Sequence, residues 1–67
     1  MIHVSVNNEI KSVTAQTLLS DALQDWGYGD SNIAVAINHE FVPRSTYAAR
    51  ALNDNDQIDI VRPVGGG

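Results

Sequence analysis

The feature most suited to chemistry is the end of the chain, where Gly65, Gly66 and Gly67 follow one another. Three glycines remove every side chain from the last stretch of backbone and permit angles that are barred to other residues. Such an end can enter a narrow channel in a partner protein, which would make the Gly67 carboxylate a reachable substrate. The same glycines would also suit a frayed terminus or an artificial extension. Composition alone leaves both interpretations open.

A carboxylate in this position would have to be activated before it could accept sulfur, because the anion repels nucleophiles and its oxygen is a poor leaving group. An enzyme that uses ATP and Mg²⁺ could convert the Gly67 carboxylate into an acyl-adenylate by positioning the phosphates and neutralising their charge. A persulfide or related donor could then displace AMP and leave a nucleophilic thiocarboxylate. Gly67 is therefore the candidate reactive residue, and Val64, Gly65 and Gly66 form the candidate partner-binding tail.

The other polar residues form no recognisable catalytic or metal-binding pattern. His3 and His39 lie far apart in the sequence and have no acidic or cysteine partner at metal-ligand spacing. No serine lies in a nucleophile-elbow motif, and so small a chain can hardly enclose the pocket that a Ser-His-acid triad needs. Asp54, Asp56 and Asp59 lack calcium-ligand spacing and suit turns or solvation. We expect no metal, no permanently bound cofactor and no self-contained catalysis.

Alternating apolar and polar residues predict the strands that would position the tail. Their ranges are 2–6, 9–13, 33–37, 40–42 and 57–61. The third of these is so apolar that we expect it to be buried on both faces at the centre of a sheet. Pro43 lacks a backbone donor and therefore marks the fourth strand as an edge or an end. The pairs Asn7-Asn8 and Asn38-His39 suit tight turns that need left-handed backbone angles.

One amphipathic helix is predicted between the second and third strands. An apolar stripe that includes Leu18, Leu19, Ala22, Leu23 and Trp26 supports it. We expect Thr17 to cap its start and Gly27 to end it, after about two and a half turns, with a positive φ. Trp26 is expected to pack against the core. A single short helical turn is expected within residues 45–52.

The resulting order provides one main helix to cover one face of one mixed sheet of about five strands. This is the β-grasp arrangement, of the α+β class. We assign residues 1–62 to a β-grasp domain and residues 63–67 to a flexible C-terminal tail. If the larger apolar side chains face the helix, then Ala34, Ala36 and Val61 lie on the opposite face. That face could be a docking surface for an activating enzyme, or neighbouring loops could simply cover it.

The composition is that of an ordinary globular domain, with 43% hydrophobic and 18% charged residues. The formal net charge is −4, and the four basic residues are scattered along the chain, which disfavours a nucleic-acid partner. There are no cysteines to form disulfides. No apolar stretch approaches the roughly 20 residues that span a bilayer, and the N-terminus lacks a secretory signal. We expect a cytoplasmic protein with no membrane partner.

Several short segments resemble a known family, and together they extend over essentially the whole chain. They are Gln16-Thr17-Leu18, Ala36-Ile37-Asn38, Val42-Pro43-Arg44 with Tyr47, Asp54-Asn55-Asp56-Gln57-Ile58 and Val64-Gly65-Gly66-Gly67. On these segments the chain resembles the ThiS family, the sulfur-carrier proteins of thiamine biosynthesis, which are similar in fold to ubiquitin. Gly66 and Gly67 match the family's terminal diglycine, whereas Gly65 is an additional glycine. Arg44 could contact a partner or stabilise its turn.

The resemblance implies that a ThiF-type adenylyltransferase activates the terminal glycine with ATP and Mg²⁺. It also implies a sulfur donor, such as a cysteine desulfurase system, and delivery of the sulfur to a ThiG-type thiazole synthase. Three alternatives stay open. They are a β-grasp sulfur carrier for another pathway, such as the small subunit of molybdopterin synthase, a ubiquitin-like protein modifier, and a binding module whose tail has no role. The length of the chain and the segment from Asn38 to Arg44 favour thiamine biosynthesis.

Overall fold

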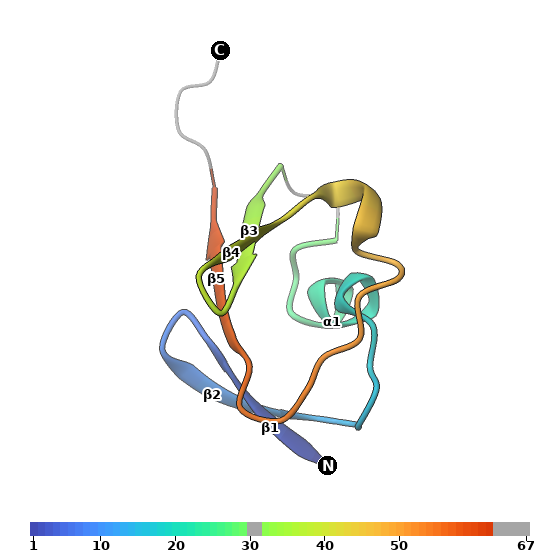
Figure 1. Cartoon of the computed structure of the whole chain (residues 1–67), viewed down its shortest axis with the longest axis vertical. Coiled ribbons are helices and arrows are strands. Elements are labelled where there is room, and N and C mark those ends of the chain that lie inside the picture. The colour runs from blue at the N-terminus through green and yellow to red at the C-terminus, as the bar shows by residue number, and fades with distance from the viewer. Residues whose placement is uncertain (30–31, 63–67) are drawn as a thin grey trace.

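The computed structural model describes residues 1–29 and 32–62, and all five predicted strands are found among them. The elements are β1 (Ile2–Val6), β2 (Glu9–Val13), α1 (Leu19–Asp25), β3 (Ala34–Ile37), β4 (Glu40–Val42), the 3-10 helix η1 (Arg44–Thr46) and β5 (Gln57–Val61). Figure 1 shows α1 on one side of the sheet. The predicted class, a mixed five-stranded sheet with one helix against it, is therefore confirmed. The predicted single short helical turn also forms, but it begins at Arg44, one residue before the predicted range.

The strands form one sheet in the order β2-β1-β5-β3-β4. β1 and β5 run parallel, and the other three pairings are antiparallel. The central position of β3 was wrongly predicted, because β5 lies at the centre and β3 lies between β5 and the edge strand β4. Burial of β3 on both faces was also wrong. Ala34 and Ala36 are only half-buried because the single helix covers one face of the sheet.

Both predicted asparagine turns are confirmed. Asn7 and Asn8 adopt φ angles of 51° and 68°, and Asn38 and His39 adopt 53° and 69°. Two consecutive left-handed residues give the turn whose twist matches that of an antiparallel hairpin. These turns fix the register of β1 against β2 and of β3 against β4, so that every side chain of the four strands is assigned to a face.

The helix α1 begins differently from the prediction. Thr17 does not cap it, because the Thr17 hydroxyl donates to the carbonyl of Thr14 at 2.6 Å and the capping position is Leu18, which makes no side-chain capping bond. The first N–H groups instead find backbone acceptors in the segment after η1. The Leu19 N–H donates to Arg50 at 2.7 Å and the Ser20 N–H to Tyr47 at 3.1 Å. These bonds satisfy donors that a helix leaves without internal partners.

The end of α1 agrees with the prediction. Gly27 adopts a φ of 89°, and the Tyr28 N–H turns back to the Leu23 carbonyl at 2.8 Å. This arrangement satisfies a late carbonyl of the helix and directs the chain away from its axis. The helix has about two turns, slightly fewer than predicted.

A single apolar cluster lies between the sheet and α1. Its buried members are Val4, Val6, Leu19, Ala22, Leu23, Ile33, Val35, Ile37, Val42, Leu52, Ile58 and Ile60. Trp26 is partly buried and packs against this cluster, so its predicted core role is confirmed. The buried cluster includes residues from α1 and from every strand except β2, so the sheet and the helix stabilise one another.

Candidate functional site

The candidate reactive residue and the candidate tail lie outside the residues that the structure describes. These are Gly67 for reaction, and Val64, Gly65 and Gly66 for partner binding. Their roles stay predictions, as does the predicted domain boundary after residue 62. The structure does place the base of the tail, because β5 ends at Val61 and Arg62 is the last described residue. The tail is thus attached to the central strand of the sheet.

The last part of β5 is held from both sides. On one side Val61 pairs with Ala34 of β3. On the other side the ladder with β1 has ended, and the side chain of Asn7 takes its place. The Ile60 N–H donates to Oδ1 of Asn7 at 2.8 Å, and Nδ2 of Asn7 donates to the Ile60 carbonyl at 3.1 Å. The base of the tail is therefore held by the pairing of Val61 with β3 and by the bonds of the Asn7 side chain to the backbone of Ile60.

The predicted docking residues lie on the face of the sheet that α1 leaves uncovered. Ala34 and Ala36 are half-buried there, and Val61 is 58% exposed. Phe41 of β4 joins them, because it is paired with Ala36 and is 68% exposed. We call Ala34, Ala36, Phe41 and Val61 the outer patch. It lies directly beside the base of the tail, since Val61 belongs to both.

Phe41 was missed by the analysis of the sequence, although a signal for it existed. Successive residues of a strand point to opposite faces, and Val42 is buried in the core. The assignment of Val42 to the core therefore requires Phe41 to face outward. An aromatic side chain exposed in a strand is a common contact in protein interfaces. Its position beside two alanines turns a nearly flat face into one with a projecting ring.

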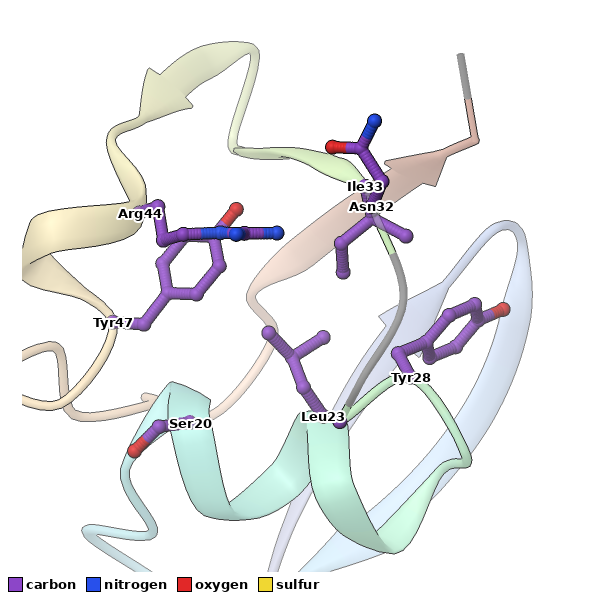
Figure 2. Close-up of a pocket in the computed structure, with 8 residues that line it drawn as sticks. Ser20, Leu23, Tyr28, Asn32, Ile33, Arg44 and Tyr47 are labelled. Carbon is purple, nitrogen blue, oxygen red and sulfur yellow. The ribbon is translucent and has the colours of Figure 1, made fainter. Parts of the chain in front are cut away.

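A cleft of about 520 Å³ opens between the end of α1 and the segment from η1 onward. Figure 2 shows Arg44 and Tyr47 on one side of it and Tyr28 on the other, with Leu23 and Ile33 between them. Leu23 and Ile33 are both buried and provide an apolar floor. Among the described residues, the lining contains no carboxylate and no histidine. Arg44 lines this cleft from the start of η1.

Among the described residues, neither histidine belongs to a cluster of possible metal ligands. His3 and His39 are both exposed, and His39 lies in the β3-β4 turn. Within residues 1–29 and 32–62, no three His, Cys, Asp or Glu side chains gather closely enough to hold a metal ion. Over the same residues, no helix has the length and apolar character needed to cross a membrane.

The segments around Asn38 and Asp56 meet in one polar cluster. Asp56 is 5% exposed, and its carboxylate accepts bonds from Nδ2 of Asn38 at 3.1 Å and from the Asn53 N–H at 2.8 Å. Oδ1 of Asn38 in turn accepts a bond from the Gln57 N–H at 2.9 Å. These bonds connect the turn after β3 to the start of β5. The two segments are therefore structural in this chain, because they place the central strand.

Comparison with known proteins gives a consistent picture. The model of the ThiS family matches residues 4–67. Thiazole synthases from Paramagnetospirillum magneticum and Magnetococcus marinus are 37% identical over 62 residues and 36% identical over 64 residues. These matches cover 92% and 96% of this chain but only 19% and 20% of the relatives. The chain thus spans about a fifth of the length of these curated relatives.

A solved structure is also similar. The crystal structure of the thiamine biosynthesis protein ThiS from Geobacter metallireducens superposes with a TM-score of 0.85 at 20% sequence identity. The superposition covers 98% of this chain and 100% of the other. The similarity confirms the predicted β-grasp fold.

Proposed function

This chain belongs to the ThiS family, and on that basis we propose that it is a sulfur carrier in thiamine biosynthesis whose Gly67 carboxylate becomes a thiocarboxylate. The observation that carries the proposal is the extent of the family match, which runs from residue 4 to residue 67 and so includes all three terminal glycines. A glycine end has the reach and the freedom from side chains that an enzyme channel requires. In this proposal the chain is a protein co-substrate, and its partners are the enzymes.

The reaction has two stages. A ThiF-type adenylyltransferase uses ATP and Mg²⁺, and a carboxylate oxygen of Gly67 attacks the α-phosphorus to form the acyl-adenylate with release of pyrophosphate. The persulfide sulfur of a donor, such as a cysteine desulfurase system, then attacks the acyl carbon and AMP leaves. A thiol cleaves the resulting acyl disulfide, which leaves the thiocarboxylate on Gly67. ATP and Mg²⁺ belong to the activating enzyme, and we place the reaction in the cytoplasm.

The sheet supplies a surface from which the tail can be presented. The outer patch is apolar at Ala34, Ala36 and Val61, carries the exposed ring of Phe41, and is continuous with the base of the tail. A partner that covers this patch would hold the carrier at a fixed distance from its own active site. Tail and patch would then act together, because binding energy from the patch helps to position the distant carboxylate.

The relatives support the choice of the sulfur acceptor. Both thiazole synthases are about five times as long as the segment that they share with this chain. A carrier-like segment in proteins of that name is consistent with a ThiG-type thiazole synthase as the partner that receives sulfur. We propose this enzyme as the acceptor, and the activating enzyme as the second partner that uses the same patch and tail.

The proposal can be tested by the intact mass of the protein after incubation with ATP, Mg²⁺, a ThiF-type enzyme and a sulfur donor. Exchange of oxygen for sulfur would add about 16 Da, the result expected if displacement at the activated carboxyl succeeds. A variant that lacks Gly66 and Gly67 should fold and keep its mass, which makes it the matched control. An unchanged mass of the full chain, with an enzyme shown to be active, would exclude the carrier reaction and favour a binding module. Covalent conjugates with lysines of other proteins would instead indicate a modifier.

A further inference from the structure

The last described residue makes a contact with an aromatic ring from another element. Cζ of Arg62 lies 5.1 Å from the centroid of the Tyr28 ring, within the distance over which a guanidinium is attracted to an aromatic face. Val61, one residue earlier, belongs to the outer patch. Alternation along the strand therefore directs Arg62 to the opposite face, where α1 and the residues after it lie. The contact joins the residue after β5 to the loop that follows α1.

The position of Tyr28 is fixed by its backbone bonding and its packing. Its N–H donates to the Leu23 carbonyl at 2.8 Å, and Gly27, with a φ of 89°, sets the direction of the chain just before it. The Tyr28 side chain is half-buried and packs against the apolar cluster. In Figure 2 it forms one wall of the cleft, next to the buried side chain of Leu23. Arg62, in contrast, is exposed. The ring is therefore the fixed partner, and the arginine is the partner that it holds.

We propose that Tyr28 is a positioning residue for the reaction at Gly67, because its ring holds Arg62, the residue at the base of the tail. The inference rests on the proposed function, since the position of Arg62 matters to the reaction only if Gly67 reacts. Gly67 lies five positions after Arg62, and a fully extended chain spans at most about 18 Å over that separation. The base decides which positions the carboxylate can reach.

The expected effect appears in binding and not in the chemical step. If Arg62 is held in the required position in only a fraction of the molecules, the apparent affinity for the activating enzyme is reduced in proportion to that fraction. Once the tail is inside the enzyme, the enzyme itself holds the carboxylate, so kcat is unaffected. Loss of an exposed cation–π contact should raise KM about two- to fivefold, the fold-change expected for contacts of this class.

The kinetic test measures KM and kcat for the carrier in adenylation by a ThiF-type enzyme, followed by pyrophosphate release. Tyr28→Leu removes the ring, and Arg62→Gln removes the cation. Each should raise KM two- to fivefold, whereas Tyr28→Phe and Arg62→Lys, which keep the ring and the charge, should stay near the wild-type value. The double variant Tyr28→Leu with Arg62→Gln should be no worse than either single variant, because both remove the same contact. Additive effects in the double variant would overturn the proposal.

A second measurement needs no enzyme and separates this inference from the proposed function. Backbone ¹⁵N relaxation of the isolated protein should give a lower order parameter for the Arg62 amide in Tyr28→Leu and an unchanged one in Tyr28→Phe. An Arg62 amide that is equally ordered in wild type and Tyr28→Leu overturns the positioning role, whether or not Gly67 is adenylated. If the order parameter falls as expected but the wild type is not adenylated by an active enzyme, Tyr28 does anchor the base of the tail and it is the carrier function that fails.

Discussion

Asn38 and Asp56 are joined side chain to side chain where the neighbouring strands β3 and β5 meet their loops, with Nδ2 of Asn38 donating to Oδ1 of Asp56 at 3.1 Å. Each of them also bonds to backbone. Asp56 accepts from the Asn53 N–H, and Asn38 accepts from the Gln57 N–H. The turn after β3 and the start of β5 are therefore connected through one small polar cluster around a buried carboxylate. This cluster fixes the start of the central strand β5, and β5 ends at the base of the tail.

Replacing Asp56 by Ala should destabilise the fold strongly. The substitution leaves the donors of Asn38 and Asn53 without their acceptor, and bonds to a charged group contribute more than neutral ones. We expect the free energy of unfolding to fall by about 2–3 kcal/mol, measured by urea denaturation. Asp54→Ala is the matched control, because Asp54 is an exposed neighbour whose carboxylate accepts from the His3 N–H at the surface. Equal losses in the two variants would contradict the importance of the buried cluster.

The Asn7 side chain should be needed to hold the end of β5. Asn7→Gly keeps the positive φ of the turn and removes both bonds to Ile60. We therefore expect faster hydrogen exchange at the Ile60 amide and a loss of about 1–2 kcal/mol in stability. Asn8→Gly is the control, since Asn8 shares the left-handed angle but does not bridge to Ile60. The role of Asn7 is refuted if Ile60 exchanges at the same rate in both variants.

The two glycines after α1 should respond differently to alanine. At Gly27 an added Cβ meets no atom within 4 Å, so the cost of Gly27→Ala comes only from the φ of 89°. We expect a loss of about 1–2 kcal/mol, typical of a left-handed L-residue. At Gly29 the new Cβ would lie 3.1 Å from Cγ of Gln24, an exposed and flexible side chain that can move. Gly29→Ala should stay within about 0.5 kcal/mol of wild type. Thermal and urea unfolding of both variants measure the difference, and a larger loss at Gly29 would contradict it.

The positions of the elements could be predicted because their signals are local. Alternation of period two located every strand to within one residue, and the asparagine pairs located both hairpin turns. The glycine at the end of the helix was also recognisable, because a positive φ there is mainly a glycine property. The division of the strand residues between the two faces followed from the same alternation. Ala34, Ala36 and Val61 accordingly lie together on the face that α1 leaves uncovered.

The long-range features could not be predicted in the same way. The central position of β5 depends on its parallel pairing with β1, which brings together residues about 50 positions apart. The backbone acceptors that replace the expected Thr17 cap come from Tyr47 and Arg50, in a segment without a regular pattern. The contact of Arg62 with Tyr28 likewise joins two segments that periodicity does not relate. Such contacts emerge only once the whole chain is packed.

Phe41 should contribute most of the binding energy of the outer patch. It is the only aromatic member, it is 68% exposed, and it lies beside Ala36, so a partner that covers the patch must bury the ring. We expect Phe41→Ala to weaken binding to the ThiF-type enzyme by about 5- to 30-fold, which corresponds to an aromatic contact of about 1–2 kcal/mol. Stability should change little, because the side chain is outside the core. Isothermal titration calorimetry measures the affinity.

The chain offers a closely matched control for this prediction. Ile10 of β2 is also 68% exposed, and it lies on the far edge strand of the sheet, with β1 between it and the nearest strand of the patch, β5. Ile10→Ala should leave the affinity unchanged, since the partner has no reason to reach that edge. If both variants weaken binding equally, the interaction depends on general surface hydrophobicity and the outer patch is not the docking surface. If only Phe41→Ala weakens it, the exposed ring belongs to the surface that the partner covers, and the outer patch is the docking surface.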